Sequence, residues 1–248
     1  YSSAASDVYK RQEITVMGCL AIDEAHHQLY VSDHAKQKIF SYDMDSVMVD
    51  SLYKPQVKTA MNETLFPSEY QYINDTLSIA VLIKPTSTST FNQFLGRWNM
   101  NTGEMIPMKY THPDIQKKRI TFAASEKAGI YVECYTRHDL MTICSLDGEL
   151  LYNIYGPDWD GGNGNKLQSF GTVMIGNDKI FVSYCGEDYA RDSFPTKILV
   201  FDLEGNYLKT LETGYKISDC CYDSFNNRII LSLNDVVQFA YLDIDGII

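Results

Sequence analysis

The sequence predicts an all-β fold of the β-propeller class. Three observations favour it: short apolar runs recur about every fifty residues, each belongs to a set of short strands joined by tight turns, and no segment carries the sustained 3.6-residue apolar stripe of a helix. One four-stranded sheet cannot bury both of its faces, whereas copies arranged around an axis cover one another. A β-sandwich gives no reason for so regular a repeat, and a β-helix needs a much shorter period.

Each predicted blade is built around one apolar strand. These strands are marked by Leu29, Leu77, Ile130, Ile180 and Ile229, at intervals of 48, 53, 50 and 49 residues. A first strand is expected before each mark, at 19–23, 70–74, 120–125, 171–176 and 218–223. Third strands that end in acidic or glycine turns are expected at 38–46, 96–104, 141–149, 197–206 and 237–246. Fourth strands are expected at 47–54, 105–110, 150–156 and 207–214. The predicted blades are about 13–55, 67–110, 119–156, 168–214 and 216–248.

The two ends of the chain depart from this repeat. SSAASDVYKRQ (2–12) matches a sequencing adapter translated in frame, so we expect residues 1–12 to be an artefact and 13–248 to form one propeller domain. The last repeat stops after its third strand. We therefore expect that the N-terminal part is missing, with about one blade and the strand that closes the ring, and that the complete protein has six blades. Seven blades also fit the spacing.

Composition excludes several classes of function. The net charge of -11 argues against binding to nucleic acid or to anionic membrane surfaces, and no apolar run is long enough to span a membrane. The six cysteines form no CxxC pair and no zinc pattern, so buried free thiols are expected; Cys134 and Cys144 flank a predicted turn and are the pair best placed for a disulfide. The five histidines are expected in exposed turns. No cofactor is expected.

The richest loop is GPDWDGGNGN (156–165). Asp158, Asp160, Asn163 and Asn165 offer oxygen ligands for calcium, and Trp159 is a candidate for facing a ligand. The spacing does not match an EF-hand, because Ser169 stands where that motif has its glutamate. A loop whose Asp and Asn side chains serve its turns is the alternative, and it is favoured over calcium binding.

Two further features are candidate binding surfaces. YCGEDYARDSFPTK (184–197) is a polar insertion whose Glu187, Asp188, Tyr189, Arg191 and Asp192 are candidates for contact with a partner, or for a solvated loop with internal ion pairs; IKPTSTSTFNQF (83–94) is expected to be a flexible surface loop. Residues that begin the innermost strands are expected around the channel mouth: Glu69, Arg119, Ser169 and Lys216. Such a ring suits an anionic small molecule or a hydrated channel lining.

The blades resemble a known family. LAIDEAHHQLYVSDHAKQKIFSYD (20–43) is similar to NHL and YWTD blades, and KILVFDLEGNYLKTLETG (197–214), with NRIILSL and VQFAYLDIDG after it, resembles the TolB-like six-bladed propellers of Gram-negative gut bacteria. The resemblance implies an envelope protein, periplasmic or at the outer membrane and usually a lipoprotein. We expect the chain to act as an extracytoplasmic binding or scaffold module for a protein or small-molecule ligand at a propeller face.

Two other functions stay open as alternatives. A metal-dependent propeller hydrolase or lactonase needs several oxygen ligands that converge on the axis, and only Glu69 and Asp219 are candidates. No G-x-S-x-G nucleophile motif and no sialidase box is present, so an enzyme is disfavoured. The other alternative is the sensor domain of a larger receptor.

Overall fold

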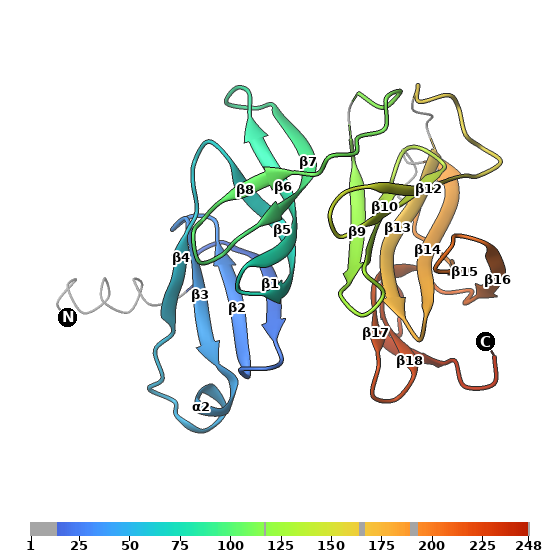
Figure 1. Ribbon diagram of the computed structural model, residues 1–248. Coiled ribbons are helices and arrows are strands. Elements are labelled where there is room, and N and C mark those ends of the chain that lie inside the picture. Colours follow the sequence, from blue (N-terminus) through green and yellow to red (C-terminus); the bar gives the residue numbers. More distant parts are fainter. Residues whose placement is uncertain (1–13, 117, 164–166, 189–192, 248) are drawn as a thin grey trace. The chain divides into compact units, whose positions relative to one another are not determined.

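The computed structural model describes residues 14–116, 118–163, 167–188 and 193–247 (Figure 1). The chain forms two compact units, residues 1–108 and residues 109–248. The predicted artefact at residues 1–12 lies outside the described residues. No helix among the described residues is long and apolar enough to cross a membrane.

The first unit contains two antiparallel four-stranded sheets in which each strand pairs with the next along the chain. The strands of the first sheet are β1 (Met17–Asp23), β2 (Gln28–Asp33), β3 (Lys38–Asp43) and β4 (Gln56–Ala60). Those of the second sheet are β5 (Phe66–Asn74), β6 (Leu77–Pro85), β7 (Phe91–Trp98) and β8 (Met105–Pro107).

The second unit contains three more sheets of the same pattern. Two have four strands: β9 (Ile120–Ser125), β10 (Ile130–Tyr135), β11 (Leu140–Ser145) and β12 (Leu150–Tyr155), then β13 (Leu167–Gly176), β14 (Lys179–Asp188), β15 (Lys197–Asp202) and β16 (Tyr207–Glu212). The last has β17 (Ile217–Asp223), β18 (Arg228–Leu233) and β19 (Phe239–Asp243). The protein is therefore an all-β β-propeller, as predicted. The described residues hold five sheets, and the six-bladed TolB-like assignment is not confirmed.

Neighbouring sheets bury each other's faces, which explains why the repeat is needed. On β10, Val132 and Cys134 point to the side that packs against Val173 and Val182 of the next sheet, and all four are buried. A second core of the same kind lies between the sheets that contain Ile198 and Ile229, and a third lies between the two sheets of the first unit. Period-two alternation along each strand sends every second side chain into such a core.

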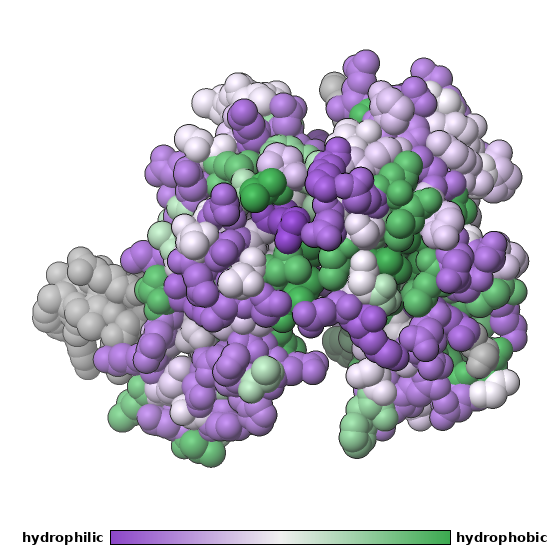
Figure 2. Space-filling view, in the orientation of Figure 1, coloured by the Kyte–Doolittle hydropathy of each residue, from purple (hydrophilic) through white to green (hydrophobic). Residues whose placement is uncertain are grey.

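The fourth strand predicted at 47–54 is wrong. Met44–Val49 forms a short helix, α2, and β4 begins only at Gln56. The Asp43 side chain accepts a hydrogen bond of 2.7 Å from the Ser46 N–H, which caps the helix. Met48 and Val49 are 82% and 85% exposed, so their apolar character did not indicate burial. Figure 2 shows hydrophobic surface around the position of α2.

The flexible loop predicted at 83–94 is also wrong. β6 and β7 continue through most of this segment as a paired hairpin, with Pro85 opposite Phe91. Only five residues form the turn, where the Thr86 N–H donates to the Thr90 carbonyl oxygen at 2.9 Å and their hydroxyls lie 2.7 Å apart. The Ser and Thr side chains close a tight turn because they hydrogen-bond locally.

A short turn follows the first strand of every blade. In most of these turns a side-chain oxygen at the end of the strand accepts a hydrogen bond from the backbone of the turn. Backbone N–H groups two or three residues ahead donate to the side-chain oxygens of Asp23, Asn74, Ser125 and Asp223. The β13–β14 turn instead uses Asn177 and Asp178, at φ of 49° and 55°. The left-handed region is the one that two-residue hairpin turns require.

Candidate functional site

The second unit has a cavity of about 610 Å³ at the beginnings of its innermost strands β9, β13 and β17, named here the hydroxyl cavity. Its polar lining consists of six hydroxyl residues and two amides: Thr121, Thr136, Thr172, Ser183, Ser193, Ser218, Gln168 and Asn234. Its other lining residues are Phe170, Gly171, Phe194, Pro195 and Ile217. Among the described residues that line it, none carries a formal charge.

Two of the hydroxyls bond from one sheet to the next. Thr121 Oγ1 on β9 donates to the Gly171 carbonyl oxygen on β13 at 2.5 Å. Thr172 Oγ1 on β13 donates to Asp219 Oδ1 on β17 at 2.7 Å. The two bonds therefore connect all three sheets of this unit around the cavity.

Three more lining hydroxyls also donate to protein oxygens. Thr136 Oγ1 donates to the Arg119 carbonyl oxygen at 3.1 Å, and Ser218 Oγ to the Ser232 carbonyl oxygen at 2.9 Å. Ser193 Oγ donates to the Asp188 carbonyl oxygen at 3.2 Å. A hydroxyl has one proton and two lone pairs. Once its proton is engaged in this way, it offers a ligand only an acceptor.

The floor of the cavity is apolar and tightly packed. Phe170 is 4% exposed and makes an edge-to-face contact with Tyr184, with ring centroids 5.4 Å apart. At Gly171 a Cβ atom would lie 2.5 Å from Ser183 Oγ and 3.1 Å from Pro195 Cγ, so a larger residue would push into the wall. The backbone approaches closely here because the residue has no side chain.

The residues predicted at the channel mouth border this cavity or lie in the other unit. Arg119 and Lys216 are exposed, and their carbonyl oxygens accept from Thr136 and Asn234, which line the cavity. Ser169 is buried, and its N–H donates to the Thr136 carbonyl oxygen at 2.9 Å. Glu69 is exposed on β5 of the first unit. A charged ring that includes Glu69 therefore stays a prediction.

The insertion at 184–197 begins as strand, not as loop. β14 continues to Asp188, and Glu187 pairs with Gln168 of β13. Glu187 is exposed, while the Asp188 carbonyl oxygen holds the Ser193 hydroxyl at the cavity wall. Tyr189, Arg191 and Asp192 lie outside the described residues. Their role in partner binding stays a prediction.

Trp159 packs against other rings. Its ring centroid lies 5.0 Å from that of Tyr155, 5.4 Å from His112 and 6.1 Å from His138. Trp159 is half-buried, so part of its surface is free for the predicted ligand contact. His112 and His138 are 3% and 5% exposed, so the expectation of exposed turn histidines is wrong for these two. His112 Nε2 lies 3.0 Å from the Tyr155 hydroxyl, and burial lowers the pKa of its imidazole.

Of the oxygens proposed for calcium, Asp160 Oδ1 accepts a hydrogen bond within its own loop, whereas the buried Asp160 Oδ2 has no hydrogen-bond partner among the described residues. Asp160 Oδ1 accepts from the Gly162 N–H at 3.1 Å, and the Asn163 amide donates to the Asp160 carbonyl oxygen at 2.8 Å. The Asp158 N–H donates to Asp139 Oδ2 at 3.0 Å. In the described part of the chain, no group of three or more His, Cys, Asp or Glu residues is placed to hold a metal ion. Asn165 lies outside that part.

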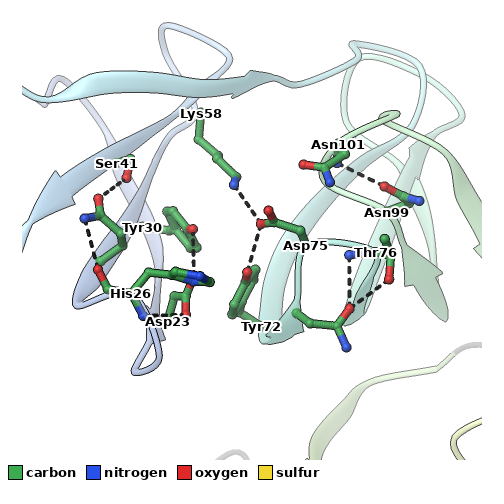
Figure 3. A network of polar contacts seen from close by, with 12 residues as sticks. Asp23, His26, Tyr30, Ser41, Lys58, Tyr72, Asp75, Thr76, Asn99 and Asn101 are labelled. Carbon is green, nitrogen blue, oxygen red and sulfur yellow. Dashed lines mark hydrogen bonds and ion pairs between the residues drawn. The ribbon is translucent and has the colours of Figure 1, made fainter.

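A polar network joins the two sheets of the first unit (Figure 3). Lys58 Nζ and the Tyr72 hydroxyl donate to Asp75 Oδ1 at 2.7 and 2.8 Å. The Lys58 ammonium also lies 5.3 Å from the centroid of the Tyr30 ring, and the Tyr30 hydroxyl donates to the buried Asp23 at 3.2 Å. Because each polar group has its partner within the network, we interpret the network as a structural connection between the two sheets.

The cysteines are free thiols. Cys134 and Cys144 lie on paired strands but at different register positions: Cys134 is opposite Met141 and Cys144 is opposite Tyr131. Cys134 points into the core that packs against the next sheet. Burial raises the pKa of the Cys144 thiol to about 11 and that of Cys220 to about 12.

Comparison with solved structures supports the fold. The chain is similar to the extracellular domain of a protein described as a one-component system from B. thetaiotaomicron, with a TM-score of 0.58 and 14% identity over 91% of this chain and 27% of that one. It is also similar to a protein of unknown function from Bacteroides caccae (TM-score 0.53, 12% identity, 93% of this chain and 78% of that one). A chain of a nidogen/laminin complex gives a TM-score of 0.60 and 10% identity over 94% of this chain and 78% of that one.

These similarities establish the fold alone, because the identities are 14% or lower. The chain spans about a quarter of the first of these solved chains, at 27%. Neither a family model nor a curated protein matches the sequence.

Proposed function

We propose that this chain is an extracytoplasmic β-propeller module that binds a small molecule in the hydroxyl cavity. The supporting observation is the cavity itself, whose volume of about 610 Å³ lies within the range of about 300–1,000 Å³ usual for small-molecule sites. It combines an apolar floor with several polar groups from three sheets, the composition expected of such a site. Arg119 and Lys216 border it and are proposed to contact parts of the ligand that extend outside.

The location in the cell is part of the same proposal. Fold similarity to an extracellular bacterial domain supports an extracytoplasmic location, and the resemblance to TolB-like propellers supports a lipoprotein-like envelope protein, periplasmic or at the outer membrane. A sensor domain within a larger receptor is the second candidate, because that neighbour belongs to a protein described as a one-component system. Fractionation of cells that carry the natural gene, with protease added outside intact cells, tests the location.

Saturation-transfer NMR on the full chain tests binding. The probes are a set of neutral, anionic and cationic small molecules, and the key variant is Asn234→Trp, which places a large side chain at the rim of the cavity. Asn234 is exposed, and its backbone N–H, which bonds to the Lys216 carbonyl oxygen, is kept. We expect at least one class to bind the parent and to lose its signal with the variant. Binding of no class, or equal binding to a folded Asn234→Trp protein, would overturn the proposal.

A further inference from the structure

The hydrogen-bond directions in the hydroxyl cavity restrict what it can bind. Thr121, Thr172 and Ser218, on three different strands, all donate their protons to protein oxygens. Each therefore presents only lone pairs to the interior of the cavity. A ligand that satisfies them must bring several donors of its own, placed to meet acceptors on three sides.

The charge of the lining restricts the ligand further. The described lining residues are uncharged, and the charged residues placed beside them are Asp219, which accepts from Thr172, and Arg119 and Lys216, whose carbonyl oxygens accept from Thr136 and Asn234. Desolvating an unpaired charge is costly. Arg119, the nearest charged residue before β9, directs a guanidinium N–H to the Lys118 carbonyl oxygen at 2.9 Å. Because the Asp219 carboxylate already accepts from Thr172, neutral hydroxyl donors match the uncharged lining acceptors, and the same acceptors disfavour carboxylates.

The remaining lining groups suit the same chemistry. The side-chain amides of Gln168 and Asn234 carry both donors and acceptors, so they complement the oxygens of a hydroxyl-rich ligand. The half-buried Phe194 adds apolar surface, against which the C–H face of a ring can pack. A molecule with one apolar face and a rim of hydroxyl groups satisfies both kinds of surface.

We infer that the hydroxyl cavity binds a neutral, polyhydroxylated ligand, a saccharide unit, by accepting hydrogen bonds from its hydroxyl groups. The inference rests on the proposed function, because it names the ligand class of the same site. Thr172 Oγ1 is one of the acceptors, and Asn234 supplies an amide at the rim.

The experiment compares three sets of probes on the full chain by saturation-transfer NMR and calorimetry. The neutral set is glucose, galactose, N-acetylglucosamine and their disaccharides; the anionic set is glucuronate and galacturonate; the cationic set is glucosamine and spermidine. We expect a neutral saccharide to bind more tightly than its charged counterparts. Stronger binding of an acid or an amine that Asn234→Trp blocks would overturn this inference and leave the proposed function standing.

Two variants test the contacts. Thr172→Val keeps the side-chain shape but removes the acceptor, and we expect saccharide binding to weaken about tenfold, the equivalent of one hydrogen bond. The matched control is Thr210→Val on β16, whose hydroxyl lies against Tyr207 and outside the cavity; it should bind like the parent. Asn234→Ala alters an exposed side chain and keeps the test open if Thr172→Val does not fold. Binding unchanged in both cavity variants, or no neutral saccharide bound at all, would overturn the inference.

Discussion

Lys118 Nζ lies 2.8 Å from Glu133 Oε1, although the side chains are only 6% and 3% exposed. The Lys118 ammonium also lies 5.7 Å from the centroid of the Tyr135 ring. The pair fastens the segment before β9 to β10. Removing one partner of such a buried ion pair lowers the unfolding free energy, because the remaining charge stays desolvated.

We predict that Lys118→Met or Glu133→Leu alone costs about 3–5 kcal/mol of unfolding free energy, whereas the double variant recovers most of it. Urea unfolding of the four proteins in a double-mutant cycle measures the coupling. The exposed pair Lys127 and Asp178, 82% and 70% exposed, serves as control: Lys127→Met should change stability little. Single variants as stable as the parent would contradict the prediction.

His112 gives a pH dependence whose sign follows from burial. Burial is the main cause that lowers its pKa, and the charges of Lys118 and His138 act in the same direction, while Asp114 and Glu133 oppose them. The unfolded chain, with an imidazole pKa of about 6.5, then binds the proton first. The contribution of neutral His112 to the unfolding free energy is therefore fully present above about pH 6.5. It is lost as the pH falls from there toward the lower pKa of the folded protein.

NMR titration of the His112 imidazole should show a midpoint below about 6.5, and His112→Gln should flatten the loss of melting temperature between about pH 7 and pH 5. Gln keeps a polar group for the Tyr155 hydroxyl, which lies 3.0 Å from the His112 ring nitrogen. A midpoint at or above the unfolded value would show that the assigned cause is wrong.

Cys221 is the cysteine that is exposed in the folded protein. We predict that iodoacetamide modifies it first, and slowly at neutral pH, because burial and the charges of Asp219 and Asp223 raise its pKa above the ordinary value. Peptide mapping by mass spectrometry follows each thiol over time, and Cys221→Ser should remove the first phase. Modification of Cys134 at the same rate would mean that the core between the sheets opens.

Asp75 in the first unit should support stability only when it is ionised. Hydrogen bonds from Lys58 and Tyr72 lower its pKa below the ordinary value. The contribution is present above about pH 3.8 and is lost as the pH falls through the lower folded value. Asp75→Asn should therefore lower the melting temperature modestly at pH 7 and less near pH 3. Asp45→Asn, at an 80% exposed carboxylate, is the control. An equal effect of Asp75→Asn at both pH values would refute the assignment.

The second strand of each blade is the part of the fold that the sequence predicts best. Leu29, Leu77, Ile130, Ile180 and Ile229 all lie in the second strands, because continuous apolar runs follow from burial on both faces. The short helix after Asp43 was not predicted because it depends on a single capping hydrogen bond. Its apolar residues also follow a pattern that is typical of a strand. The length of the β6–β7 hairpin was missed because Ser and Thr are common in strands and loops alike.

Three residues predicted at the channel mouth lie two or three positions before residues that line the hydroxyl cavity. Arg119, Ser169 and Lys216 precede Thr121, Thr172 and Ser218, which line the cavity from the first strands of three blades. A small hydroxyl residue in each of these three first strands, at intervals of 51 and 46 residues, was a signal in the sequence. The direction of each hydroxyl proton was not predictable, because Thr172 and Asp219 meet only through the packing of two sheets.

The side-chain-closed turn at Asp223 lies at the opposite end of β17 from the cavity, and Phe225 in it is 94% exposed. A fluorophore or a biotin anchor attached there would leave both the strand register and the mouth of the cavity undisturbed. This end of the blade is therefore a suitable site for attaching the protein to a sensor surface.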